Sequence, residues 1–144
     1  MSSISANLTR DHRRCDELFA RAEEHVARGD WAQAGRDFSE FTRAMEQHLR
    51  FEEDKLFPAF EQASGSRAGP TRMMRMEHEQ MRTLFRDMET GLQAREANRY
   101  LGLSETLLIL MQQHNMKEEH ILYRLAEQVL GSTGEALAAR LVQP

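Results

Sequence analysis

A histidine followed four positions later by a glutamate occurs at two places in the chain. The first pair is His48 and Glu52, within HLRFE, and the second is His114 and Glu118, within HNMKE. In a helix, this spacing places both side chains on one face, one turn apart. An imidazole nitrogen beside a carboxylate oxygen is a suitable half-site for a transition metal. Each pair is therefore a candidate metal-binding element.

The two pairs lie in an internal repeat with an offset of 66 residues. Residues 48–65 read HLRFEEDKLFPAFEQASG and residues 114–131 read HNMKEEHILYRLAEQVLG, which match without a gap at His, Glu, Glu, Leu, Glu, Gln and Gly. The same offset aligns Asp11-His12 with Glu77-His78. A single pair would usually be a solvated surface pair, but two copies, each preceded 36 residues earlier by another histidine, favour one shared site. The candidate ligands are His12, His48, Glu52, His78, His114 and Glu118.

Four imidazoles and two carboxylates restrict the choice of metal. A closed zinc site usually takes four ligands and favours thiolates, and calcium and magnesium prefer oxygen ligands. A pair of octahedral first-row ions suits this set if each glutamate bridges the two ions. An oxide or hydroxide could complete the bridge, and coordination positions would remain for a small ligand. We expect iron, and manganese is chemically admissible.

Three other motifs do not fit the sequence. His78-Glu79 begins like the zinc-protease motif HExxH, but Arg82 replaces the second histidine. Ferritin-like di-iron proteins use Glu-x-x-His, which has the opposite order and a different spacing. The single Cys15 has no CxxC partner.

Long helices must position these ligands. Only three prolines and eight glycines interrupt a chain that is rich in helix-forming residues, and this composition predicts an all-α protein. Short links favour an up-down-up-down four-helix bundle, in which the middles of neighbouring helices share one level. We predict a single domain over residues 1–144, with helices at about 8–28, 31–62, 70–96 and 101–130 and a short C-terminal helix at 134–142.

Several other residues have expected places in these helices. We expect Asn7 or Thr9 to cap the first helix, and Pro58 to kink the second helix or to end a first segment there. Ala59 and Leu125 continue the inward-facing seams beyond the two glutamates.

Residues beside the candidate ligands are interpreted as supporting or packing groups. Glu53 and Glu119 follow the ligand glutamates in both repeats and are expected to be surface charges or to lie just behind the ligands. His120 is likewise expected at the surface or just behind the ligands. His25 is expected to be solvated, and Cys15 is expected to be a packed thiol. Tyr123 is expected to anchor packing, with a redox relay as the alternative.

Composition argues against some classes of function. The 144 residues include 19 basic and 23 acidic residues, a net charge of −4, without a basic stripe; nucleic acid is therefore not an expected partner. No segment approaches the roughly 20 apolar residues of a membrane span, and the first residues lack the apolar core of a signal peptide. One cysteine excludes an internal disulfide. We expect a soluble, cytoplasmic protein without a membrane partner.

The pattern H…HxxxE…H…HxxxE, with HLRFEEDKLFP and HNMKEEHILY around the paired ligands, resembles the hemerythrin-like (HHE cation-binding) domain over roughly residues 8–130. The resemblance implies a four-helix bundle with two non-haem iron ions held by the six candidate residues. Oxygen-carrying hemerythrins have a further histidine four residues after the third one, where this chain has Arg82. This difference disfavours reversible dioxygen carriage and favours reaction with, or sensing of, dioxygen, nitric oxide or peroxide.

The resemblance therefore implies a di-iron protein for a small ligand, and peroxidase or nitric-oxide-handling activity are the enzymatic forms to test. The alternative is a non-catalytic iron or oxygen sensor or storage module that acts through a protein partner. The pattern also resembles the C-terminal domain of iron–sulfur-cluster repair proteins, which implies iron donation, although the short cysteine-bearing module that precedes that domain is not found in this sequence.

Overall fold

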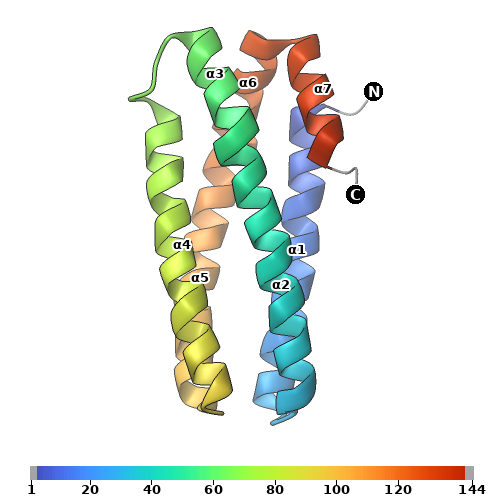
Figure 1. Ribbon diagram of the computed structural model, residues 1–144, viewed down its shortest axis with the longest axis vertical. Helices are drawn as coiled ribbons and strands as arrows, with labels where there is room; N and C mark the ends of the chain where they lie inside the picture. Colours follow the sequence, from blue (N-terminus) through green and yellow to red (C-terminus); the bar gives the residue numbers. More distant parts are fainter. Residues whose placement is uncertain (1–2, 142–144) are drawn as a thin grey trace.

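The protein is all-α, as the sequence predicts, and the computed structural model describes residues 3–141 (Figure 1). Residues 1, 2 and 142–144 lie outside this range, so the predicted domain of residues 1–144 and the predicted last residue of the C-terminal helix fall partly outside it. None of the helices in residues 3–141 is long and apolar enough to cross a membrane. The α-helices are α1 (Ile4–Ala27), α2 (Trp31–Phe51), α3 (Phe57–Ser64), α4 (Pro70–Gln93), α5 (Ala97–Lys117), α6 (Tyr123–Leu130) and α7 (Ser132–Leu141).

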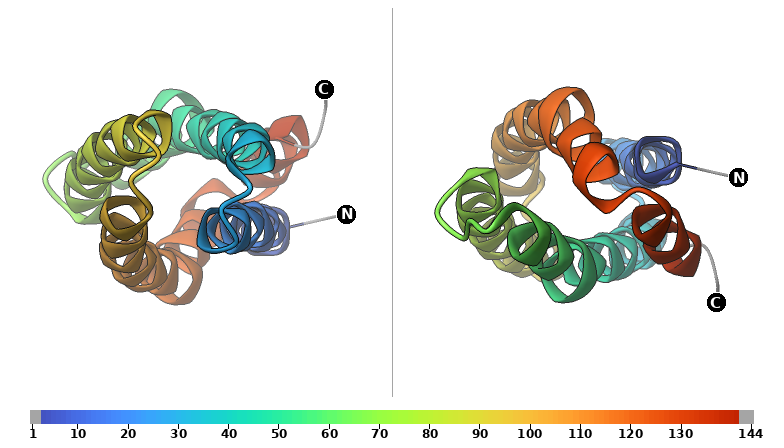
Figure 2. Two further views of the ribbon diagram at one scale, coloured as in Figure 1. Left: turned by 90° about the horizontal axis from the view of Figure 1, so that it is seen from below. Right: turned by 90° about the horizontal axis from the view of Figure 1, so that it is seen from above.

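Two short π-helical turns make α2–α3 and α5–α6 into two long continuous rods. The turn η1 (Glu52–Leu56) joins α2 to α3, and η2 (Glu118–Leu122) joins α5 to α6. With α1 and α4, these rods form a ring of four antiparallel neighbours when the molecule is viewed from either end (Figure 2). The short α7 packs on α1, α6 and η1 at the end that carries the N-terminus (Figure 1).

Helix α1 begins at Ile4, one turn earlier than predicted. The cap is Ser3, whose hydroxyl oxygen accepts a hydrogen bond of 3.1 Å from the backbone N–H of Ala6. Asn7, which was predicted as a possible cap, is a buried residue inside the helix. The apolar face gains a turn because Ile4 is buried as fully as Leu8.

The link between α4 and α5 is shorter than predicted: α4 ends at Gln93 and α5 begins at Ala97. Gly91 packs against the start of α5: a β-carbon there would lie 3.6 Å from the backbone nitrogen of Tyr100, which is an ordinary van der Waals contact. Arg95 adopts a positive φ of 54°, and the N–H of Glu96 donates to the carbonyl of Gly91 at 2.9 Å. Gly91 thus lies inside α4 as a buried residue near its end.

The π-helical turns change which residues face inward. The N–H of Phe57 donates to the carbonyl of Glu52, five residues earlier, and Tyr123 donates to Glu118 in the same way. Each turn therefore accommodates one residue more than an α-helix would. Leu125, predicted to face inward, is consequently 38% exposed.

The first repeat shows the same shift of inward positions. Ala59 was predicted to face inward but is only half-buried, and the next residue, Phe60, is buried instead. Pro58 lies in the first turn of α3, directly after η1. It is not the cause of the turn, because η2 has the same form although Arg124 occupies the equivalent position.

The interior consists of two apolar clusters. One fills the end near the α1–α2 and α4–α5 links and contains Cys15 and Met81, and the other fills the opposite end and contains Leu8 and Met74. Along α1, His12 falls between Leu8 and Cys15, and along α4 the corresponding histidine falls between Met74 and Met81. A layer of buried polar side chains therefore separates the two clusters.

Candidate metal centre

All six predicted ligands meet in this polar layer. Each is at most 5% exposed, although histidine and glutamate are polar and glutamate is normally charged. They form two groups, and within each group the candidate ligand atoms lie within 4.8 Å of one another. Both groups include Glu52 and Glu118; His12 and His48 complete the first, and His78 and His114 complete the second.

Each histidine is fixed from behind by a carboxylate bonded to its Nδ1 atom. The distances are 2.7 Å from His12 to Glu119, 2.7 Å from His48 to Asp11, 2.7 Å from His78 to Glu53 and 2.8 Å from His114 to Glu77. A carboxylate only accepts hydrogen bonds, so Nδ1 carries the proton in all four rings. This arrangement turns each Nε2 atom toward the centre, as outer carboxylates do for histidine ligands in metal sites.

Five of the inward-facing atoms lack hydrogen-bond partners. His48 Nε2, His78 Nε2 and His114 Nε2 are buried without one, as are one oxygen of Glu52 and one of Glu118. His78 Nε2 lies 3.1 Å from Glu52 Oε1, yet both atoms remain unpaired because the contact lacks hydrogen-bond geometry. Unpaired buried nitrogen and oxygen atoms are costly, and a cation among them would remove that cost. The residues present therefore fit a metal.

Without a metal, the cluster holds protons. Burial alone would lower the pKa of His78, but the nearby carboxylate of Glu52 and the hydrogen bond to Glu53 outweigh burial and raise the pKa to about 9. Burial likewise acts against the other histidines of the cluster, and the buried glutamates and outer carboxylates again raise their pKa values. Burial would raise the pKa of Glu118, but its neighbouring histidines hold it well below its usual value.

Tyr123 also belongs to this layer. Its hydroxyl oxygen lies 2.6 Å from Glu52 Oε2, 2.9 Å from Glu118 Oε1 and 3.1 Å from His12 Nε2. Burial and the two glutamates raise the pKa of Tyr123 well above its usual value, so the phenol keeps its proton. The repeat places Phe57 at the equivalent position, where its ring stacks on His78 as Tyr123 stacks on His12. One half of the centre thus has a hydroxyl that the other half lacks.

The residues around the outer carboxylates Glu53 and Glu119 also differ between the two repeats. On the side of His78, Arg82 forms hydrogen bonds with both oxygens of Glu53, at 2.8 and 2.9 Å. Burial would raise the pKa of Glu53, but the bonds from His78 and Arg82 lower it to about 2. In the other repeat, Asp16 occupies the position of Arg82. Partial burial raises the pKa of Asp16, and the nearby carboxylate of Glu119 adds to this rise.

The prediction from the sequence covered only part of this arrangement. It allowed Glu53 and Glu119 to lie behind the ligands, as they do, but it gave Asp11 and Glu77 no role. The available signal was their place in the repeat, where an acid precedes both His12 and His78. The repeat could not point to the hydroxyl of Tyr123, because the equivalent residue in the first repeat is Phe57, which has no hydroxyl.

Three other expectations have mixed outcomes. His25 is not simply solvated, because its Nδ1 bonds to Asp37 at 2.6 Å and only a quarter of its side chain is exposed. His120 is exposed, as expected. Cys15 is a packed thiol, and burial raises its pKa to about 12.

Comparison with known families agrees with this geometry. The hemerythrin HHE cation-binding domain model matches residues 3–126, so the chain belongs to that family. Searches of curated proteins and of solved structures gave no match. The family and the buried histidine–glutamate groups together indicate a metal-binding site.

Proposed function

We propose that this protein is a non-haem di-iron protein whose ligands are the six residues of the cluster and which binds or reacts with a small ligand. The observation that carries the proposal is the sharing of Glu52 and Glu118 by two otherwise separate histidine pairs. A carboxylate has two oxygens and can therefore contact two ions at once. The two glutamates and the four histidines would together hold a pair of ions, and all unpaired atoms of this layer lie on these residues.

The type and number of ligands support iron. Imidazole and carboxylate together suit first-row ions that accept six ligands, and the cluster contains no thiolate. When bound, a pair of such ions supplies redox chemistry and open coordination positions for a small molecule. A reducing compartment such as the cytoplasm would suit loading with ferrous iron.

The surroundings of the cluster support a small ligand such as dioxygen, nitric oxide or peroxide. All six residues are buried, so a ligand has to reach the ions through the protein interior, which favours a small molecule. The guanidinium of Arg82 points away from the cluster to Glu46 and Glu53, so it does not take the place of a fifth imidazole. The proton of Tyr123 lies beside both shared carboxylates, where it can be donated to a bound ligand. A proton donor at this place favours reaction over simple carriage.

Metal content tests the ligand assignment. The full-length protein is loaded with ferrous iron without oxygen, desalted and analysed for metal. We expect two irons per chain, and Glu52→Ala and His114→Ala should lower this number because each removes a ligand. His25→Ala is the matched control, since His25 also bonds to a carboxylate but lies outside the cluster. Two irons in all three variants would show that the ligands are assigned wrongly.

Exposure of the reduced protein to air tests the reaction. A visible band that forms and then decays, with turnover of peroxide, is expected for a protein that reacts with its ligand. A band that persists in air would instead support carriage. Metal-dependent binding of a protein partner, without turnover, would support the sensor or storage alternative.

A further inference from the structure

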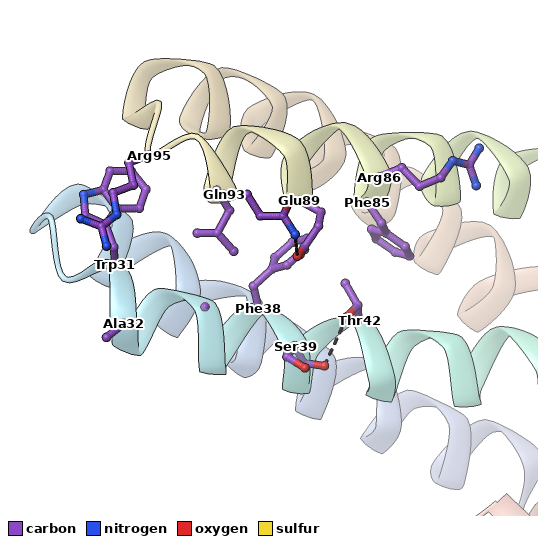
Figure 3. Close-up of a pocket in the computed structure, with 12 residues that line it drawn as sticks. Trp31, Ala32, Phe38, Ser39, Thr42, Phe85, Arg86, Glu89, Gln93 and Arg95 are labelled. Carbon is purple, nitrogen blue, oxygen red and sulfur yellow. Dashed lines mark hydrogen bonds between the residues drawn. The ribbon is translucent and has the colours of Figure 1, made fainter.

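A groove runs between α2 and α4 at the end of the bundle remote from α7. It has a volume of about 710 Å³, within the usual range of roughly 300–1,000 Å³ for small-molecule sites. Phe38 and Phe85 point into it from opposite helices, and Trp31 and Arg95 mark its far end (Figure 3). A second, smaller hollow continues the groove along the same two helices as far as Arg82.

Small residues on α2 keep the groove open. Ala32, Gly35, Ser39 and Thr42 recur every three or four residues and line one wall. A β-carbon added at Gly35 would meet no atom within 4 Å, so the space beside this helix is free. The bulkier apolar side chains Phe85 and Leu92 come from α4. Phe38, Phe85 and Leu92 belong to the buried core, so the groove has an apolar and aromatic floor.

The charged side chains around the groove are mainly basic, whereas the whole chain has a net charge of −4. Four arginines and two glutamates line it and its continuation. Glu46 pairs with Arg82, and Glu89 accepts a hydrogen bond from Gln93. Among residues 3–141, the other three arginines have no ion pair and are available to an incoming anion; they are Arg43, Arg86 and Arg95.

We propose that this groove binds a small organic anion that combines an apolar body with a carboxylate or phosphate group. The apolar body lies over the floor that Phe85 and Phe38 form and against the partly exposed Trp31, and Arg86 or Arg95 pairs with the anionic group. Arginine suits either group because its planar donors match two oxygens at once. The proposal is independent of iron, since none of the six cluster residues lines the groove.

Trp31 provides the measurement, because it is the only tryptophan of the chain and lines the groove. Decanoate, decyl phosphate and decanol are titrated separately into the full-length protein while Trp31 emission is recorded. We expect saturable changes with one or both anions and at least about tenfold weaker binding of decanol. The comparison of the two anions shows whether the groove prefers carboxylate or phosphate. Absence of a saturable change with both anions, or equal binding of decanol, would overturn the proposal.

Two pairs of variants locate the site. Gly35→Leu should fill the groove and abolish binding, whereas Gly102→Leu, at another helical glycine with open space around it, should not. Arg86→Gln with Arg95→Gln should weaken anion binding at least about tenfold. The same loss of charge in Arg72→Gln with Arg124→Gln, at exposed positions outside the groove, should leave it unchanged. Thermal melting checks that each variant is folded, and native-like binding by a folded Gly35→Leu protein would refute the location.

Discussion

Metal-free and metal-loaded protein should respond to pH in opposite directions. In the metal-free protein, the contacts of His78 raise its pKa from 6.5 to about 9. A raised pKa in the folded state means that the bound proton favours folding. The resulting stability is fully present below pH 6.5 and is lost as the pH rises through about 9.

The size of this effect follows from the pKa of His78. The shift spans about 2.5 pKa units, and each unit corresponds to about 1.4 kcal/mol, so His78 alone contributes at most about 3.5 kcal/mol, of which about 3 kcal/mol is lost between pH 6 and 9.5. Solvent does not weaken these electrostatic contacts, because the side chain of His78 is fully buried. The other three histidines shift in the same direction and add to the trend.

The loaded protein should show the reverse trend. A metal takes the unprotonated Nε2 atoms, so its binding releases protons and strengthens as the pH rises. A free metal concentration about 1,000 times the Kd adds roughly 4 kcal/mol to the stability of the folded state. Metal removal should therefore destabilise the protein most at alkaline pH.

Urea unfolding at pH 6, 7.5 and 9.5 measures both trends, once with a chelator and once with saturating ferrous iron without oxygen. The free energy of unfolding should fall with pH in the chelated sample and rise in the loaded one. His78→Gln, which cannot take up this proton, should show a smaller fall by about 3 kcal/mol. The reasoning fails if the chelated protein is most stable at pH 9.5, or if His78→Gln keeps the full pH dependence.

Three further predictions concern single side chains. Tyr123→Phe removes the hydroxyl beside two buried carboxylates and should cost the metal-free protein about 1–3 kcal/mol, measured by urea unfolding; moving the hydroxyl with Phe57→Tyr in the same chain should recover part of the loss, and an unchanged stability of Tyr123→Phe would contradict the hydrogen bonds. Glu53→Gln should weaken metal binding about 10–100-fold because a neutral amide replaces the charged carboxylate that accepts from His78 Nδ1, whereas Asp54→Asn, at the exposed neighbouring position, should match the native protein in the same metal titration. Cys15, with a pKa of about 12, should be alkylated at pH 8 only after urea unfolds the chain, so rapid modification of the folded protein would show that its burial is wrong.

The helical architecture could be predicted because the sequence pattern repeats the same information many times. Inward positions recur along each helix, and breaks such as Gly29-Asp30 lie where the structure has its links. The π-helical turns could not be predicted from that pattern. One extra residue in a turn leaves no clear mark in the sequence, but it rotates every later residue of the helix to another face. Leu125 is exposed for this reason. Periodicity that is extrapolated through such a turn gives the wrong face.

The convergence of six candidate ligands could be predicted because the repeat aligns four histidines and two glutamates at once. The residues that contact them from behind were harder to identify. Asp11 lies on the same helix as His12 but bonds to His48, and Glu53 follows Glu52 but bonds to His78. These contacts cross between helices, and their existence depends on helix packing that no local spacing specifies. The pairing of His25 with Asp37 between α1 and α2 was missed for the same reason.

The division of the ligands between the two repeats has a consequence for how such a centre can arise. Each repeat supplies two histidines, one shared glutamate and two outer carboxylates, and each group of ligands needs a glutamate from the other repeat. A two-helix hairpin of half this length could therefore form the complete centre only as a symmetric homodimer. In a homodimer, every substitution appears on both sides. Joining both hairpins in one chain removes that constraint, and Tyr123 opposite Phe57 and Arg82 opposite Asp16 are differences that a symmetric homodimer cannot have.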